Sequence, residues 1–113
     1  MERQRIGQSA EDAAVTFLEA HGVTILLRNY RGKVGELDIV ARDGSTLVIV
    51  EVRLRSSDRF GGAAASVDPR KQAKIRRAAA LLIHQRKDLA VFPVRFDVIA
   101  IGRKGLEWIK HAF

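Results

Sequence analysis

The sequence predicts an α/β fold with the element order αβββαβ, and residues 106–110 are a candidate for one further strand. Near the N-terminus and again after residue 68, apolar residues recur every three or four positions, as in a helix with one buried face. Between and after these segments lie short runs rich in valine and isoleucine, which favour strands. The chain has 113 residues, of which 47% are apolar, so one domain spanning residues 1–113 is expected.

Two segments are predicted to be helical by their spacing and by their end signals. The first is expected to run from about Ser9, a favourable N-cap residue, to about His21. The second is expected to follow Asp68 as N-cap and Pro69 at the first helical position, and to end near Arg86.

The remaining segments are predicted to be strands and the loops that join them. The expected strands are residues 23–30, 36–41, 46–54, 94–101 and, as the candidate, 106–110. The expected loops are the basic, glycine-flanked segment 31–35, the small and polar segment 55–67, and the turn 102–105.

Three acidic residues, Glu36, Asp38 and Glu51, interrupt the apolar second and third strands. The turn between these strands decides how the acids meet. A two-residue type II′ turn at 44–45, with glycine first, pairs residues whose numbers sum to 89. Asp38 is then opposite Glu51, with Cβ atoms about 4.5–5.5 Å apart. In the same register Glu36 is opposite Arg53.

Two carboxylates at that distance repel each other, and a divalent cation is the simplest remedy. An ion such as Mg²⁺ that binds between them can polarise a phosphate and acidify a bound water, as phosphodiester hydrolysis requires. Two alternatives stay open. The acids can form solvated ion pairs with nearby arginines. A turn at 43–44 would instead place Asp38 opposite Ile49 and Glu36 opposite Glu51.

The chain is strongly basic, with 20 Lys and Arg against 13 Asp and Glu, a net charge of +7 and a pI near 10.6. Such a charge favours a nucleic-acid partner. On the second helix, basic residues recur at helical spacing, although an ordinary solvated face is the alternative. The predicted nucleic-acid-binding set consists of the cations of this stripe and of the third strand, together with Gln72 on the same helix: Arg53, Arg55, Arg70, Lys71, Gln72, Lys74 and Arg77.

Several classes of protein are not expected from this sequence. No apolar run approaches the roughly 18 residues of a membrane span, and the N-terminus lacks the hydrophobic region of a signal peptide. The chain has no cysteine, so disulfides and thiolate metal sites are excluded. A cytoplasmic protein is therefore predicted.

The acidic motifs Gly35-Glu36-x-Asp38 and Glu51-Val52-Arg53 occur together with "AEDAAVTFLEAHGVTILLRNYR", "RFGGA" and "KQAKIRRAA". This ordered set, over about residues 7–101, resembles the YraN-like family of small bacterial predicted endonucleases, which are distantly similar to archaeal Holliday-junction resolvases. The resemblance implies the restriction-endonuclease-like fold of the PD-(D/E)xK superfamily, a central mixed β-sheet flanked by helices. Glu36 belongs to the family signature and is expected to be an accessory site residue.

The resemblance also implies roles for individual residues. Asp38 and Glu51 match metal ligands, and Glu11 matches a third ligand supplied by the first helix. Lys71 and Gln72 match a Lys-Gln pair expected to contact the substrate or the attacking water. The implied cofactor is Mg²⁺ or Mn²⁺, the implied substrate is structured or branched DNA, and a homodimer is the implied assembly.

At one position the chain departs from the superfamily pattern, because Arg53 stands where a lysine is expected. Arginine keeps its proton in proteins and cannot act as a base, although it can hold a phosphate with two hydrogen bonds. With Arg53 in this phosphate-binding role, the main hypothesis is a metal-dependent endonuclease that has Asp38, Glu51 and Arg53 as catalytic residues. The alternatives are a catalytically weak or inactive nucleic-acid-binding module, and a protein-interaction adaptor that uses the strand edge at 106–110.

Overall fold

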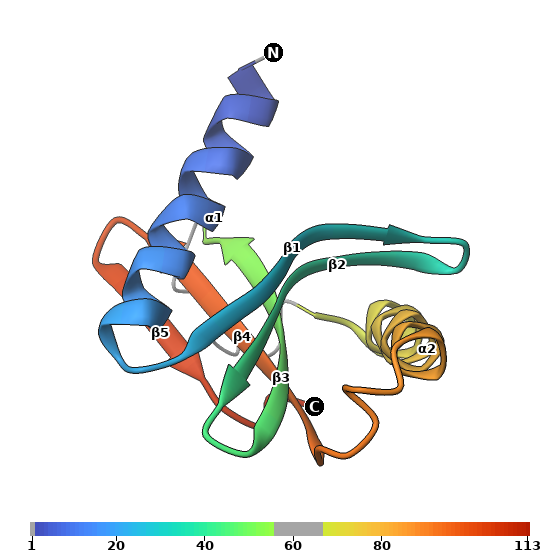
Figure 1. Ribbon diagram of the computed structural model, residues 1–113. Helices are drawn as coiled ribbons and strands as arrows, with labels where there is room; N and C mark the ends of the chain where they lie inside the picture. Colours follow the sequence, from blue (N-terminus) through green and yellow to red (C-terminus); the bar gives the residue numbers. More distant parts are fainter. Residues whose placement is uncertain (1, 56–66) are drawn as a thin grey trace.

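A computed structural model describes the backbone of residues 2–55 and 67–113 and the side chains of residues 9–55 and 67–113. The elements are α1 (Glu2–Ala20), β1 (Thr24–Gly32), β2 (Gly35–Asp43), β3 (Thr46–Leu54), α2 (Pro69–Gln85), β4 (Val94–Gly102) and β5 (Gly105–Ile109). They form one mixed sheet in the order β1-β2-β3-β4-β5, with the two helices packed against it (Figure 1). The predicted α/β fold is confirmed, including the additional strand at the C-terminal end.

The sheet is antiparallel except between its third and fourth strands. β3 and β4 are parallel neighbours, and α2 lies in the connection between them. A parallel pair requires a long crossover, and a helix is its usual form. The mixed sheet with flanking helices that the restriction-endonuclease-like fold implies is therefore present.

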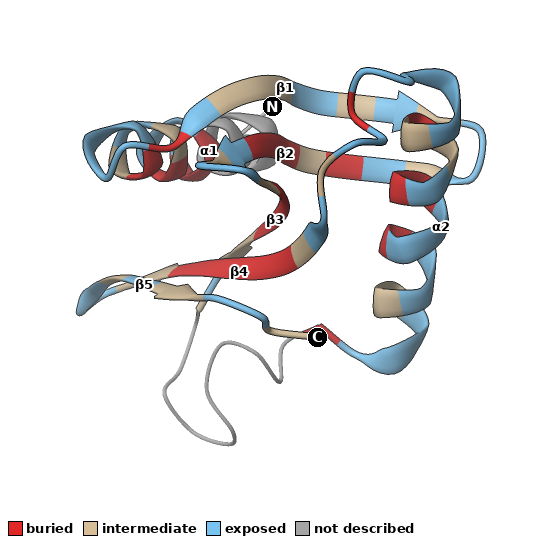
Figure 2. Cartoon of the chain, turned by 60° about the horizontal axis from the view of Figure 1, so that its bottom comes forward, coloured by how far each residue is buried: buried red, intermediate tan, exposed pale blue. Residues whose placement is uncertain are grey.

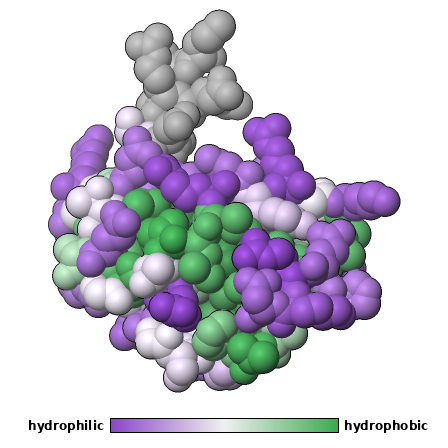
Figure 3. Space-filling model, in the orientation of Figure 1, coloured by the Kyte–Doolittle hydropathy of each residue, from purple (hydrophilic) through white to green (hydrophobic). Residues whose placement is uncertain are grey.

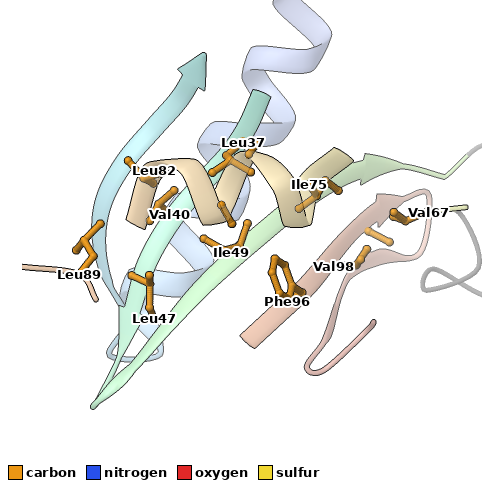
Figure 4. Close-up of a cluster of buried hydrophobic side chains, with 13 residues drawn as sticks. Leu37, Val40, Leu47, Ile49, Val67, Ile75, Leu82, Leu89, Phe96 and Val98 are labelled. Atoms are coloured by element: carbon orange, nitrogen blue, oxygen red, sulfur yellow. The ribbon is translucent and has the colours of Figure 1, made fainter. Parts of the chain in front are cut away.

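Alternating side chains of the central strands divide the core into two clusters, one under each helix. Under α2, Val40 and Ile49 pack with Ile75 and other buried residues of the helix and β4 (Figure 4). On the opposite face, Ile39 and Val50 pack with residues of α1. Figure 2 shows the buried residues gathered along the central strands and the inner sides of the helices. Because both faces of β3 are covered, an acid on this strand leaves water when the chain folds.

Two predicted boundaries are wrong. The first helix begins at Glu2 rather than Ser9, so Ser9 lies inside a helix and is not its N-cap. The preceding residues are mostly glutamate, glutamine and arginine, which favour helix and extend it past a local capping signal.

No helix in the described part of the chain is long and apolar enough to cross a membrane.

The second wrong boundary is the predicted loop at 31–35, since most of it belongs to a continuous hairpin. β1 and β2 extend to the pair Gly32 and Gly35, leaving a two-residue turn at 33–34. Glycines are weak strand formers on their own, but the pairing of the two strands carries them into the sheet. Most of the other predicted loop, 55–67, lies outside the described residues.

The predicted hairpin register is confirmed. Asp43 pairs with Thr46, and the pairs continue in step to Ile39 with Val50. Gly44 has a φ of +62°, whereas the only described non-glycine residues with positive φ are Asn29 and His111, so Ser45 has a negative φ. This combination is the one that a type II′ turn requires.

We expect Gly44→Ala to lower the free energy of unfolding by about 1–2 kcal/mol, because a side chain there is strained at positive φ. No atom lies within 4 Å of a Cβ added at Gly44, so the cost comes from the backbone alone. Urea denaturation measures the change, with Ser45→Ala as the control in the same turn. Equal stabilities for both variants and the wild type would contradict the turn assignment.

Candidate functional site

The candidate site lies where β2 separates from β3. The ladder between these strands ends at the pair of Ile39 and Val50, one residue short of Asp38. Beyond this point β2 continues with β1 only, and the hairpin diverges from β3 (Figure 1). The Asp38 Oδ2 atom accepts a hydrogen bond of 2.9 Å from the Val52 backbone N–H, in place of a backbone acceptor. Asp38 thereby stays beside β3 at the predicted position.

Glu51 is an almost completely buried acid, with only 4% of its surface exposed. Burial, followed by the negative charge of Asp38, raises the pKa of Glu51 to about 7. The positive charges of Lys71 and Arg53 act in the opposite direction without compensating for this rise. Asp38 and Glu51 therefore form a pair of neighbouring carboxylates in which burial and mutual repulsion oppose ionisation of Glu51.

The first turn of α2 supplies a lysine to this pair. The Asp68 side chain caps the helix by accepting a hydrogen bond of 2.8 Å from the Lys71 backbone N–H. The Lys71 Nζ atom then lies 3.5 Å from the Glu51 Oε1 atom. Gln72, which was predicted to face the substrate, donates its side-chain amide to the Val67 carbonyl at 2.9 Å. Lys71 therefore contacts the carboxylate pair, whereas Gln72 stabilises the segment that leads into α2.

Arg53 presents an unused hydrogen-bond donor near Glu51. Its Nε atom is buried and has no hydrogen-bond partner among the described residues. A buried donor without a partner is costly, and a phosphate oxygen is a suitable acceptor for a guanidinium group. An anion that reached this buried nitrogen would satisfy the unused donor.

The predicted pairing of Glu36 with Arg53 is wrong. Glu36 is exposed, and its carboxylate lies 3.6 Å from the Nε atom of Arg31 on β1. The cause is that β2 pairs with β3 only from Ile39 onward, so Glu36, which precedes Ile39, pairs with Arg31 of β1 instead. An accessory role for Glu36 within the carboxylate pair finds no support in this position.

Glu11 lies close to the pair but is held by a different partner. Its Oε1 atom accepts a hydrogen bond of 3.2 Å from Arg28 on β1, and Arg28 also binds Asp12. Burial raises the pKa of Glu11, the Arg28 contacts lower it, and the charge of Asp38 adds a further rise. Glu11 thus senses Asp38 electrostatically while its carboxylate is directed to Arg28.

Whether a divalent cation fits this arrangement depends on the donors present. Within the described residues, no three Asp, Glu or His side chains form a group that could hold a metal ion. Mg²⁺ does not need such a cage, because it usually binds through one or two carboxylates, waters and phosphate oxygens of the substrate. The buried and mutually repelling pair of Asp38 and Glu51 fits this mode, and Glu11 would have to leave Arg28 to join it.

The predicted basic residues are arranged in two ways. Arg70, Lys74 and Arg77 are exposed on α2, as the stripe requires. Figure 3 shows hydrophilic side chains covering α2 and the far end of the β1–β2 hairpin on one face of the molecule. Arg55, by contrast, is tied to β5, where its Nη1 atom donates to Glu107 Oε1 at 2.8 Å.

Sequence reasoning missed Asp97, the acid in the middle of β4. Asp97 is completely buried and accepts hydrogen bonds from the Arg95 guanidinium, from Trp108 Nε1 and from the His111 backbone N–H, all between 2.9 and 3.1 Å. An isolated acid within an apolar strand was the available signal. Because both oxygens are engaged by donors, Asp97 has a structural role and not that of an open ligand.

The mixed sheet, the helices on its two faces and the carboxylate pair at the strand separation define a small α/β protein with restriction-endonuclease-like architecture. The chain belongs to the UPF0102 family, since the model described as "Uncharacterised protein family UPF0102" matches residues 10–101. The UPF0102 protein of Pseudomonas savastanoi pv. phaseolicola is 50% identical over 116 residues, which cover 98% of this chain and 94% of the relative.

Two further relatives agree with this membership. The UPF0102 protein of Nitrosomonas europaea is 48% identical over 95% of this chain and 92% of its own length. The UPF0102 protein of Hahella chejuensis is 49% identical over 96% of this chain and 89% of its own length. The resemblance to the YraN-like family is thereby confirmed, and the similarity extends over nearly the whole chain.

Proposed function

We propose that this protein is a metal-dependent endonuclease that binds structured or branched DNA. The observation that carries the proposal is the pair of Asp38 and Glu51, in which a buried carboxylate is kept beside a second negative charge. Such an arrangement opposes folding, so a role for the pair in binding a cation explains why it is present. The net charge of +7 favours a polyanionic substrate.

The carboxylate pair and the two cations beside it each have a defined task in this proposal. Asp38 and Glu51 bind Mg²⁺ or Mn²⁺, which when bound supplies Lewis-acid polarisation of the phosphate and a more acidic water. Arg53, which is partly exposed, donates from its guanidinium group to an oxygen of the scissile phosphate. Lys71, the cation that contacts Glu51, brings a second positive charge to the same phosphate. Lys71 thus contributes the ammonium group that the third motif position lacks.

The second candidate function is a nucleic-acid-binding module with weak or no catalysis. The observation that favours it is Arg53, since a guanidinium cannot accept a proton from water. Such a module binds nucleic acid through its basic surface but does not cleave the phosphodiester bond. The two candidates differ in a single measurable property, metal-dependent cleavage.

The test is Asp38→Asn, which keeps an oxygen acceptor for the Val52 N–H and removes one negative charge from the pair. We expect cleavage to fall by about 10²–10³-fold, as loss of several kcal/mol of metal-assisted stabilisation implies. The measurement uses labelled linear, flap, single-stranded and four-way DNA with Mg²⁺ or Mn²⁺. A second readout is the rise in melting temperature with added Mg²⁺, which the variant should lose.

The matched control is Asp88→Asn, the same chemical change at an exposed acid that pairs with Arg86. This control should cleave and respond to Mg²⁺ like the wild type. Full cleavage by Asp38→Asn would contradict the endonuclease proposal. DNA binding by the wild type without any metal-dependent cleavage would favour the inactive module.

A further inference from the structure

The β1–β2 hairpin extends past the point where β3 leaves it. The β2–β3 ladder ends at Ile39, whereas the β1–β2 ladder continues to Gly32 and Gly35. Figures 1 and 2 both show this end of the hairpin running alongside α2. The part of the hairpin that projects from the sheet therefore begins beside Asp38 and ends at the turn 33–34.

The projecting end is supported by α2. Leu37 is buried in the cluster under the helix, and the Tyr30 hydroxyl donates to Gln85 Oε1 at 3.2 Å. At Gly35 the backbone passes so close to α2 that an added Cβ would lie 3.6 Å from the Lys74 carbonyl oxygen. These contacts fix the direction of the hairpin, so its turn is presented in a defined position.

The turn itself faces solvent with a basic and an apolar residue. Lys33 is exposed, and Val34 is one of four exposed large apolar residues in the described part of the chain, at 42% exposure. Arg31 precedes them, with its side chain 78% exposed and 3.6 Å from Glu36. No ion pair or hydrogen bond involves the Lys33 side chain within the described residues. A cationic turn with an uncovered valine is suited to a partner that offers phosphates and flat apolar edges.

A row of lysines joins this turn to the candidate site. Lys71 contacts Glu51, and Lys74 follows one turn later on the exposed side of α2, beside the hairpin at Gly35. Residues three apart on a helix are neighbours on its surface. Lys71 and Lys74 on α2 and Lys33 on the neighbouring turn therefore place three lysines between the carboxylate pair and the end of the hairpin.

We infer that the turn at Lys33 and Val34 enters a groove of a DNA duplex and holds a double-stranded arm beside the scissile phosphate. This inference rests on the proposed function and names the part of the substrate that the hairpin recognises. The major groove of DNA admits a two-stranded β-ribbon, and thymine methyl groups in it accept apolar contacts. Lys33 and Lys74 contact phosphates on the two sides of that groove.

The length of the hairpin sets where this contact falls. Asp38 lies four positions after Val34, which at about 3.3 Å per residue corresponds to roughly 13 Å. Phosphates follow each other by about 3.4 Å along the duplex axis, so a hairpin lying along the duplex makes its contact within roughly four base pairs of the cleaved bond. The substrate must accordingly contain a duplex arm of about that length next to the site.

The test compares the double variant Lys33→Gln/Val34→Ser with the control Lys87→Gln/Val91→Ser. The control makes the same two changes at exposed residues beyond the C-terminal end of α2, about 20 Å along the helix axis from Lys71. Binding to a labelled 24-base-pair duplex and to a single strand of equal length is measured over a range of salt concentrations without divalent metal. Circular dichroism and thermal melting establish that both variants are folded.

We expect the hairpin variant to bind the duplex at least about fivefold more weakly and to lower the salt slope by about 1, with little change on the single strand. The control should match the wild type on both. In cleavage assays, the wild type should prefer arms of eight base pairs to arms of two, and the hairpin variant should lose that preference.

Two results overturn the inference, and they are distinguishable. If the wild type binds and cleaves DNA and the hairpin variant behaves like the control, the hairpin does not hold the arm, and the proposed function stands. If the hairpin variant loses affinity equally for the duplex and for the single strand, the hairpin likewise does not hold the duplex arm, and the proposed function stands. If the wild type binds no nucleic acid, the proposed function and the inference fall together.

Discussion

Replacing Asp97 by alanine should lower the free energy of unfolding by about 2–4 kcal/mol, because a buried arginine keeps only Asp43 of its two carboxylate partners and further buried donors lose their acceptor. The Arg95 guanidinium donates to both Asp97 oxygens and is itself only 11% exposed in its side chain. Trp108 and the His111 backbone lose their acceptor in the same variant. These contacts attach β5 and the C-terminal residues to β4, so the loss should affect the whole sheet edge.

Urea denaturation measures this loss, and Asp88→Ala is the control. Asp88 also pairs with an arginine, but both groups are exposed to solvent, so its removal should change the free energy of unfolding far less than the loss of Asp97 does. If Asp97→Ala does not fold, Asp97→Asn provides the measurement, since an amide keeps one acceptor for Trp108. A stability of either Asp97 variant within 1 kcal/mol of the wild type would contradict the role assigned to this acid.

In metal-free protein, Glu51→Gln should remove a decrease in stability that the wild type shows between about pH 4.5 and 7. The pKa of Glu51 is raised to about 7 in the folded protein, so folding favours the protonated carboxyl. That contribution is fully present below the unfolded pKa and is lost as the pH rises through about 7. The difference in pKa corresponds to up to about 3 kcal/mol at pH 8. The variant should therefore be the more stable protein at alkaline pH.

The experiment is urea denaturation at several pH values from 4 to 8 in the presence of a chelator. Glu19→Gln, at an exposed position of α1, is the control and should follow the pH dependence of the wild type. Added Mg²⁺ should recover stability at pH 8 in the wild type and not in Glu51→Gln. An unchanged pH dependence in Glu51→Gln would show that Glu51 ionises normally and would weaken the case for a strained carboxylate pair.

These two acids show why a buried carboxylate alone does not identify a site. Asp97 and Glu51 are both buried in apolar strands, yet the oxygens of Asp97 are matched by donors from arginine, tryptophan and the backbone. Glu51 faces another carboxylate, and its single lysine contact is at 3.5 Å. Incomplete compensation of charge distinguishes a candidate binding group from a structural one.

The sequence by itself determined the local structure of this protein. Apolar spacing placed the helices and strands to within a few residues, apart from the start of α1 and the turn at 33–34. Glycine at position 44 determined the hairpin turn, and the turn determined the register that brings Asp38 to Glu51. These features follow from backbone geometry and from contacts between nearby residues, which a sequence pattern records directly.

Only the tertiary structure decided which charged side chains meet at the site. β2 pairs with β3 only from Ile39 onward, so Glu36 lies by Arg31 on β1 and not by Arg53. The packing of α2 on the sheet places Lys71 in contact with Glu51, which lies twenty positions earlier in the sequence. The packing of α1 against β1 places Glu11 within hydrogen-bonding distance of Arg28. Such contacts depend on how helices pack on the sheet and where strands diverge, and these arrangements minimise the exposed apolar surface of the whole chain. No local pattern contains that information.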